Sequence, residues 1–252
     1  MTGIELFAIF SGFIIGSGID AASRRFETGT PWLTHRSRCD HCQRPLRWFE
    51  LVPVVSWLAL RGRCRTCKAS IGWSAPLTEC AGALAALVAV ALTPRDVPYG
   101  IIFSLSFGWL LLALAAIDRR HFILPDVLNA ALLAAGAIMV AVTKPADWPM
   151  HLAGAATGFG LLWLVEIAYR RLRGIDGLGR GDAKLLGAIG AWVGLIGIPS
   201  VLLIASVAAI AGTLIISLVQ KQSVSGKTPI AFGPWIALAG FTVWLLPPPG
   251  WV

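Results

Sequence analysis

The chain has 252 residues, of which 56% are hydrophobic and only 13% are charged. About a quarter of the residues of a soluble domain are charged, and the apolar residues here stand in long blocks, so a soluble globular domain is excluded. The net charge of +8 alone would suit a nucleic-acid-binding protein, but the placement of the cations argues against that partner.

The long apolar runs predict an all-α polytopic membrane protein. About 20 apolar residues carry a helix across the hydrocarbon core, and a helix satisfies its own backbone polar groups there. About eight transmembrane helices are expected, over residues 4–22, 74–92, 98–117, 127–143, 150–168, 185–198, 200–219 and 229–247.

A signal peptide has Lys or Arg before its apolar part. Neither residue precedes the first run here, so this run is predicted to be an uncleaved helix. Its glycines, Gly12, Gly16 and Gly18, favour close approach of another helix. Asp20, near its end, is expected to be solvated or to cap the helix.

The loop over residues 23–73 holds ten Lys and Arg and three acids. At 51 residues it is too long for a turn and is expected to form a small domain or a lid.

Two Cys-x2-Cys pairs lie in this loop, 21 residues apart. Two such pairs supply the four thiolates of a tetrahedral zinc site, and a site closed by four cysteines is structural, since it leaves no open position. The predicted ligands are Cys39, Cys42, Cys64 and Cys67. Two disulfides or four free thiols are the alternatives. His41 is a spare ligand, and Cys80, in the second run, is expected to be an ordinary buried thiol.

The cations set the orientation, because cytoplasmic loops are rich in Lys and Arg. With the N-terminus outside, the inner loops are 23–73, 118–126, 169–184 and 220–228. They contain 19 of the 21 Lys and Arg, which explains the high charge without nucleic acid. Both termini are then periplasmic, and the cysteine loop is cytoplasmic.

Two acids stand at this inner edge. Asp118 closes one apolar run, and Asp182 opens another after the glycine-rich stretch 177–181. Gly179 and Gly181 permit backbone conformations closed to other residues. A carboxylate at a helix C-terminus opposes the helix dipole, so capping does not explain Asp118.

The pattern therefore suggests an aspartyl protease with Asp118 and Asp182 as its pair. Two carboxylates in proximity share one proton, so that one activates water while the other protonates the carbonyl. An ion or proton pathway is the alternative use of acids at a membrane. Asp126 is a supporting residue or a helix N-cap, and Lys184 is expected to orient the pair or to meet a lipid phosphate.

Two glutamates lie in or near apolar runs. Glu79 is expected to face an arginine of the inner loop. Glu166 is expected to pair with Arg170 or Arg171 on its own helix.

The same segments resemble, in order, the bacterial prepilin peptidases, which are leader peptidases and N-methyltransferases of type IV pilus and type II secretion systems. The matching pieces are Gly16-Ser17, the two cysteine pairs, residues 48–57, 61–67, 76–79, 117–126 and 179–185, and Phe232-Gly233-Pro234.

This resemblance implies that Asp118 and Asp182 are catalytic, and that prepilin or pseudopilin leaders are cut on the cytoplasmic side after a glycine. It also implies N-methylation with S-adenosylmethionine and a bacterial inner-membrane location. The expected domains are a first transmembrane helix (1–22), a tetracysteine zinc domain (23–73) and a transmembrane protease domain (74–252). A transporter with a zinc-binding cytoplasmic domain is the alternative function.

Overall fold

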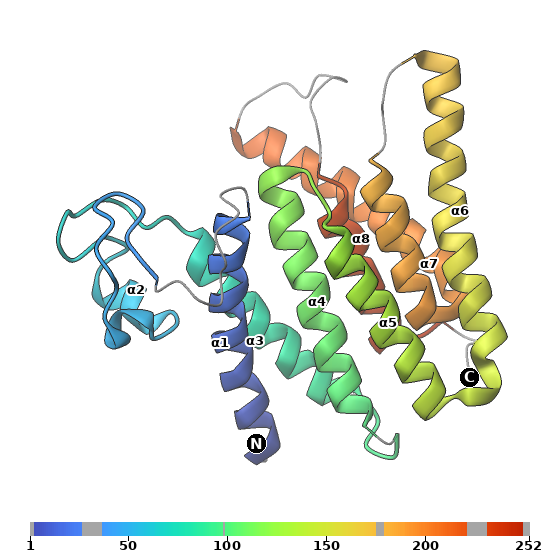
Figure 1. Ribbon diagram of the computed structural model, residues 1–252, viewed down its shortest axis with the longest axis horizontal. Coiled ribbons are helices and arrows are strands. Elements are labelled where there is room, and N and C mark those ends of the chain that lie inside the picture. Colours follow the sequence, from blue (N-terminus) through green and yellow to red (C-terminus); the bar gives the residue numbers. More distant parts are fainter. Residues whose placement is uncertain (1–2, 27–36, 98, 175–178, 221–230, 249–252) are drawn as a thin grey trace. The chain divides into compact units, whose positions relative to one another are not determined.

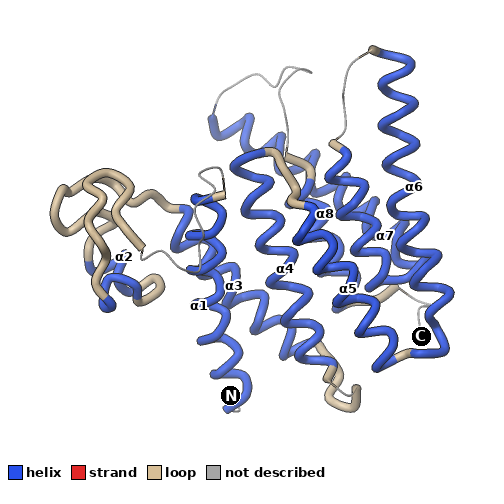
Figure 2. Tube along the Cα trace, viewed as in Figure 1, coloured by secondary structure: helices blue, strands red, loops and turns tan. Residues whose placement is uncertain are grey.

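The computed structural model describes residues 3–26, 37–97, 99–174, 179–220 and 231–248. These residues form helices and loops, with no strand beyond two isolated bridges among them (Figures 1 and 2). The long helices are α1 (Gly3–Arg25), α3 (Ser74–Leu92), α4 (Gly100–His121), α5 (Asp126–Thr143), α6 (Trp148–Arg173), α7 (Arg180–Gln220) and α8 (Gly233–Leu245). The predicted all-α architecture is confirmed.

Six of these helices, α1 and α3 to α7, are long and apolar enough to cross a membrane, and α8 is a shorter apolar helix of 13 residues. The chain is thus a multi-pass membrane protein. At 1.5 Å per residue, the 41 residues of α7 would extend roughly 60 Å, twice the hydrocarbon thickness of ~30 Å.

A reversal at Gly194 explains this length. Gly194 has φ 66° and ψ −179°, a backbone conformation that is essentially reserved for glycine. Figure 1 shows α7 running down from residue 180 and back up to residue 220. The predicted helices 185–198 and 200–219 are therefore both present, but the boundary between them lies at Gly194 and not at residue 199, between the two predicted ranges. Pro199 lies inside the second arm, five residues after Gly194.

The chain divides into two compact units, residues 1–91 and 92–252. In the first unit, α1 and α3 pack closely through glycine. A Cβ on Gly12 would lie 2.5 Å from the Gly82 carbonyl oxygen, and one on Gly16 would lie 2.5 Å from that of Thr78. The predicted role of these glycines in helix approach is confirmed. It is wrong for Gly18, which has nothing within 4 Å.

The described part of the loop 23–73 lies in the first unit. It contains a 3-10 helix, Trp48–Leu51, and the short helix α2, Val55–Ala59. Cys80 is exposed, so the expectation of a buried thiol is wrong. The outer surface of a membrane helix faces lipid, so an apolar thiol there needs no protein around it.

The second unit contains α4 to α8, and its core centres on Trp192 of α7. The Trp192 ring is fully buried, stacks on Phe107 of α4 at 4.4 Å between ring centroids, and meets Trp244 of α8 edge-on at 5.4 Å. Its Nε1 donates to the Leu132 carbonyl of α5 at 2.8 Å. One side chain thus fixes four helices at the same level.

The helix ends next to the cation-rich segments lie on one side of the second unit, as the distribution of Lys and Arg predicts. In Figure 1 the end of α4, the end of α6 and both ends of α7 lie on the same side of the second unit. The described residues of the segments 118–126 and 169–184 therefore share one face. Of the segment 220–228, only its first residue lies within the described chain.

Candidate active site and metal centre

Asp118 and Asp182 stand at the same level of the second unit. Asp118 lies 11 residues along α4 from Phe107, and Asp182 lies 10 residues along α7 from Trp192, towards the same face. These separations correspond to rises of roughly 16 Å and 15 Å. Because Phe107 and Trp192 are stacked, both acids reach the same depth near the ends of their helices.

The two carboxylates are also linked laterally. The Asp182 carboxylate lies close enough to Asp118 to feel the repulsion of its like charge. The backbone of Gly181, beside Asp182, meets the segment after α4 so closely that a Cβ would lie 2.9 Å from Cβ of Leu124. Both acids are buried, with 5% and 8% of their surface exposed. The structure thus brings the predicted pair together.

Asp118 gains a partner that sequence reasoning did not identify. The backbone N–H of Gly233, the first residue of α8, donates to Asp118 Oδ2 at 3.1 Å. The positive end of α8 therefore faces a carboxylate that opposes the dipole of its own helix. The sequence Gly233-Pro234 indicates the start of a helix, because proline is common in the first turn. It does not indicate that this helix contacts Asp118.

Asp182 sits in the first turn of α7, and its own helix N-terminus favours its charge. Its N–H donates to the Gly179 carbonyl at 3.0 Å, and the Gly179 N–H donates to its carboxylate. Gly177, the first glycine of the predicted stretch, lies outside the described residues.

Lys184 and Asp126 form an ion pair, with 2.6 Å between Nζ and Oδ1. The pair joins the first turns of α7 and α5 beside the two buried acids. Asp126 is the first residue of α5 and Pro125 occupies the N-cap position, so the reading of Asp126 as an N-cap is wrong. Since both side chains are well exposed, at 43% and 74%, the pair contributes little stability.

Glu166 anchors the start of α7 to α6. Its Oε1 accepts from Arg170 at 2.5 Å, which confirms the predicted helix-face pair, and from Arg180 at 3.1 Å. Arg180 begins α7, two residues before Asp182. Glu166 is 3% exposed, so this charge cluster holds the turn that carries Asp182.

The four predicted cysteine ligands form one cluster in the first unit. The Sγ atoms lie within 4.8 Å of one another, with 3.8 Å from Cys39 to Cys67 and 4.0 Å from Cys42 to Cys64. A tetrahedron with metal–sulfur bonds of about 2.3 Å has edges of about 3.8 Å. The thiols are free, so the cluster fits a metal ion and not two disulfides. His41 is not part of it.

Equivalent backbone turns present these cysteines. The Cys39 N–H donates to the Arg44 carbonyl at 3.0 Å, and the Cys64 N–H donates to the Ala69 carbonyl at 2.8 Å. Positive φ angles recur at equivalent places, Gln43 and Lys68. Backbone N–H groups of Cys67 and Thr66 lower the pKa of the Cys64 thiol to about 6, which favours the thiolate that binds metals.

Glu50 braces the first knuckle through Arg44 and the backbone of Arg47. Arg44 donates to both of its carboxylate oxygens, at 2.9 Å and 2.5 Å, and the Arg47 N–H donates at 2.8 Å. The Arg44 guanidinium lowers the pKa of Glu50 to about 2. Burial opposes this shift, and the hydrogen bond from the Arg47 backbone adds to it. The glutamate therefore holds the turn between Cys42 and residue 48 in place.

Comparison with known proteins agrees with this arrangement. The family pattern described as "Bacterial Peptidase A24 N-terminal domain" matches residues 10–93, and that described as "Type IV leader peptidase family" matches residues 105–214. The chain belongs to the type IV leader peptidase family. The two matches follow the division into units 1–91 and 92–252.

Relatives of this peptidase family are named prepilin leader peptidase/N-methyltransferase. One from Burkholderia pseudomallei (strain K96243) is 37% identical over 266 aligned positions, covering 95% of this chain and 84% of the relative. One from Dickeya chrysanthemi is 38% identical over 205, covering 81% and 71%. One from Aeromonas salmonicida (strain A449) is 39% identical over 208, covering 82% and 69%. No solved structure matches the chain.

Proposed function

We propose that this protein is a membrane aspartyl endopeptidase that removes the leader of type IV prepilins or type II secretion pseudopilins and then methylates the new N-terminus. One observation carries the peptidase proposal: Asp118 and Asp182 lie buried at one level of the second unit, and each meets a helix N-terminus. Membership of the type IV leader peptidase family supports the choice of substrate.

The chemistry follows from two carboxylates that share a proton. The ionised member takes a proton from water as the water attacks the scissile carbonyl, and the protonated member donates to the carbonyl oxygen. These roles belong to the pair and are not divided between Asp118 and Asp182. The N–H groups of Gly233 and Gly179 hold the carboxylates in place. Gly181 and the Lys184–Asp126 pair support the turn.

The four-cysteine cluster is proposed to hold a structural zinc ion. Cys39, Cys42, Cys64 and Cys67 supply thiolates, and four protein ligands leave no position for substrate. The ion would tie the two halves of loop 23–73 together. Proposed functional parts are the helix 1–22, this zinc domain and the protease domain 74–252.

The proposed location is the bacterial inner membrane, with both termini periplasmic. The concentration of Lys and Arg in the segments beside Asp118 and Asp182 supports a cytoplasmic placement of that face. The leader would then be cut on the cytoplasmic side while the apolar helix of the pilin stays in the bilayer. S-adenosylmethionine is the proposed methyl donor.

The test is cleavage of a prepilin by the purified full-length protein, followed by mass spectrometry of the new N-terminus. We expect Asp118→Asn and Asp182→Asn each to reduce the cleavage rate by about 10⁴-fold or more, as for members of a catalytic unit. The matched control is Asp147→Asn, in the 3-10 helix Pro145–Asp147 before α6, which should cleave like the wild type. Cleavage retained by either variant of the pair would refute the assignment.

A further inference from the structure

The cysteine loop, described over residues 37–73, exposes apolar side chains that neither the metal cluster nor the aspartate pair explains. Trp48, Leu51, Val55 and Leu58 are exposed by 80%, 46%, 61% and 62%, and together they are called the apolar face. The first two are three residues apart in the 3-10 helix and the last two are three apart in α2, so each pair stands on one side of its helix. Exposed apolar surface of this kind marks contact with a protein or a membrane.

Two hydrogen bonds of Glu79 place α2 beside the membrane helices. The N–H of Val54, directly before α2, donates to Glu79 Oε2 at 2.7 Å. Glu79 lies five residues into α3, roughly 8 Å along the axis from its first residue. Its carboxylate also accepts from the hydroxyl of Ser17, eight residues before the end of α1.

The position of Glu79 has two consequences. No cation lies within ion-pair distance of it among the described residues, so the arginine expected to face it is absent there. The start of α2 is level with the second turn of α3 and does not lie beyond the helix ends. Interfacial helices sink about 5–10 Å into the boundary between headgroups and acyl chains, which is the depth found here.

Trp57 holds α2 against the beginning of α3. Its Nε1 donates to the Gly72 carbonyl at 2.9 Å, and its ring packs on Trp73 with 4.4 Å between centroids. Trp73 directly precedes α3 and is 68% exposed. Because tryptophan is enriched where a membrane helix passes from hydrocarbon to water, these contacts keep α2 at the level of the membrane surface.

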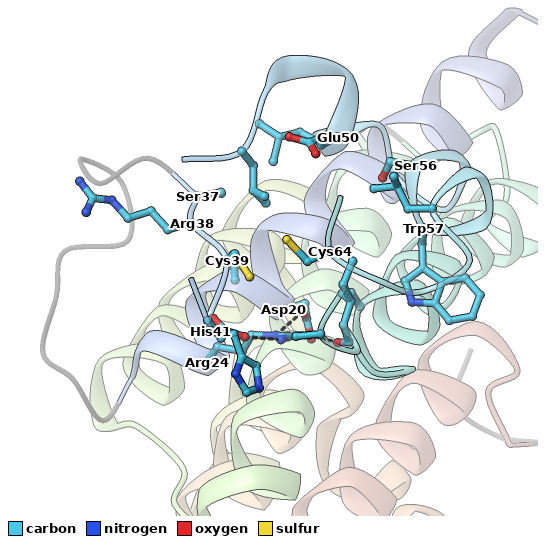
Figure 3. Close-up of a pocket in the computed structure, with 18 of the residues that line it drawn as sticks. Asp20, Arg24, Ser37, Arg38, Cys39, His41, Glu50, Ser56, Trp57 and Cys64 are labelled. Carbon is cyan, nitrogen blue, oxygen red and sulfur yellow. Dashed lines mark hydrogen bonds and ion pairs between the residues drawn. The ribbon is translucent and has the colours of Figure 1, made fainter. Parts of the chain in front are cut away.

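Arg24, near the end of α1, fixes the first cysteine pair to the same helices. Its Nε lies 2.8 Å from Asp20 Oδ2, so Asp20 is buried and paired, not solvated or capping as expected. Its two terminal nitrogens donate to Asp40 Oδ2 at 3.0 Å and to Ser74 Oγ at 2.9 Å. Figure 3 shows Arg24 beside Asp20 and close to the segment that carries His41. The loop is therefore tied to the end of α1 and the start of α3.

Cations follow the apolar face in the chain. Residues 51–78 contain Arg61, Arg63, Arg65 and Lys68 and no Asp or Glu. These four residues line one hollow of about 570 Å³ beside the end of α2. Arg65 lies over the Phe49 ring at 5.5 Å. The other three have no acid within ion-pair distance among the described residues, so their charges can meet the phosphates of lipids.

We propose that the cysteine loop lies on the surface of the bilayer, with the apolar face among acyl chains and Arg61, Arg63 and Lys68 at the phosphates of anionic phospholipid. Charge complementarity selects this occupant, because basic segments beside a membrane helix are attracted to anionic lipid. The contacts of Glu79 and Trp57 place α2 at the required depth. The membrane surface thereby holds the metal cluster in one orientation beside α1 and α3. Neither the aspartate pair nor methyl transfer enters this inference.

The test identifies by photo-crosslinking what touches the apolar face. Full-length protein with p-benzoylphenylalanine in place of Leu58 is irradiated in nanodiscs of equimolar phosphatidylglycerol and phosphatidylcholine, and the adducts are identified by mass spectrometry. The control carries the label in place of His41, which Figure 3 shows across Cys39 and Cys64 from Ser56. We expect lipid adducts at position 58 and few at position 41. Phosphatidylglycerol adducts should exceed phosphatidylcholine adducts about fivefold, the order by which one cation favours an anionic surface.

A second variant of the labelled protein removes charge. Arg61→Gln combined with Arg63→Gln should bring the lipid ratio at position 58 towards one and leave the bound metal in place. Arg95→Gln combined with Lys144→Gln removes the same charge after α3 and α5 and should keep the ratio.

Three results would overturn the proposal: equal lipid yields at positions 58 and 41, a ratio unchanged by loss of Arg61 and Arg63, or adducts at 58 with residues 92–252, a second copy or added prepilin in place of lipid. If the charge variant loses its metal, the labelled protein with all its cations decides. A ratio of about five there supports the lipid surface, and a ratio of one overturns it.

Discussion

The backbone N–H of Gly233 donates to Oδ2 of Asp118 at 3.1 Å, across 115 residues of sequence. The carboxylate fills the space where a side chain at position 233 would stand, because a Cβ built on Gly233 lies 2.6 Å from the same oxygen. The start of α8 therefore fixes both the position and the charge of one member of the aspartate pair.

Gly233→Ala should accordingly damage catalysis without unfolding the protein. The methyl group must displace the Asp118 carboxylate, and misplacement of a reacting group by about 1 Å costs on the order of 10²-fold in rate. The rate of prepilin cleavage measures this effect. Gly18→Ala is the matched control, since nothing lies within 4 Å of a Cβ there. Wild-type turnover by Gly233→Ala would show that this contact does not position the carboxylate.

The reversal in α7 gives a prediction about stability. An alanine at position 194 would have to adopt φ 66° and ψ −179°, at a cost of roughly 1–3 kcal/mol. We expect Gly194→Ala to lower the free energy of unfolding by that amount in detergent. Gly160→Ala, on α6 with open space around its Cβ, should be neutral or slightly stabilising, since alanine favours helix. Equal stabilities for the two variants would contradict the tight turn.

The cysteine cluster predicts one bound metal ion per chain. Cys39→Ser and Cys64→Ser should each lose the ion, measured by elemental analysis of the purified protein, and a chelator should lower the Tm of the wild type. Cys80→Ser should keep the ion and the Tm, because Cys80 is exposed and outside the cluster. Metal retained at full stoichiometry in both cluster variants would exclude these cysteines as ligands.

Glu50 predicts a specific acid sensitivity. Its pKa is lowered to about 2 in the folded protein, whereas an unfolded glutamate has a pKa of about 4.3. Its contribution to stability is therefore fully present above the unfolded pKa and is lost as the pH falls through about 2. The difference in Tm between the wild type and Glu50→Gln should be largest near neutral pH and shrink below about pH 4. A difference independent of pH would mean that the carboxylate charge has no part in holding the knuckle.

The sequence by itself determined the architecture and much of the site. Apolar runs of bilayer length predicted the helices, since only helices satisfy the backbone within lipid. The sorting of Lys and Arg predicted that segments 118–126 and 169–184 share a face, as Figure 1 shows for their described residues. Residue types also predicted the metal site, because two closely spaced pairs of cysteines are typical of zinc binding. All of these signals are local or compositional.

Tertiary structure alone decided which groups meet. The positive φ of Gly194, not Pro199, reverses α7, because the need for a turn there comes from packing. The partner of Asp118 is a backbone N–H that begins a helix 115 residues later, and no residue identity records a backbone contact. Glu79 was expected to meet an arginine but meets Val54 and Ser17. Whether a buried charge is neutralised depends on distances between elements, and these are set when the helices pack.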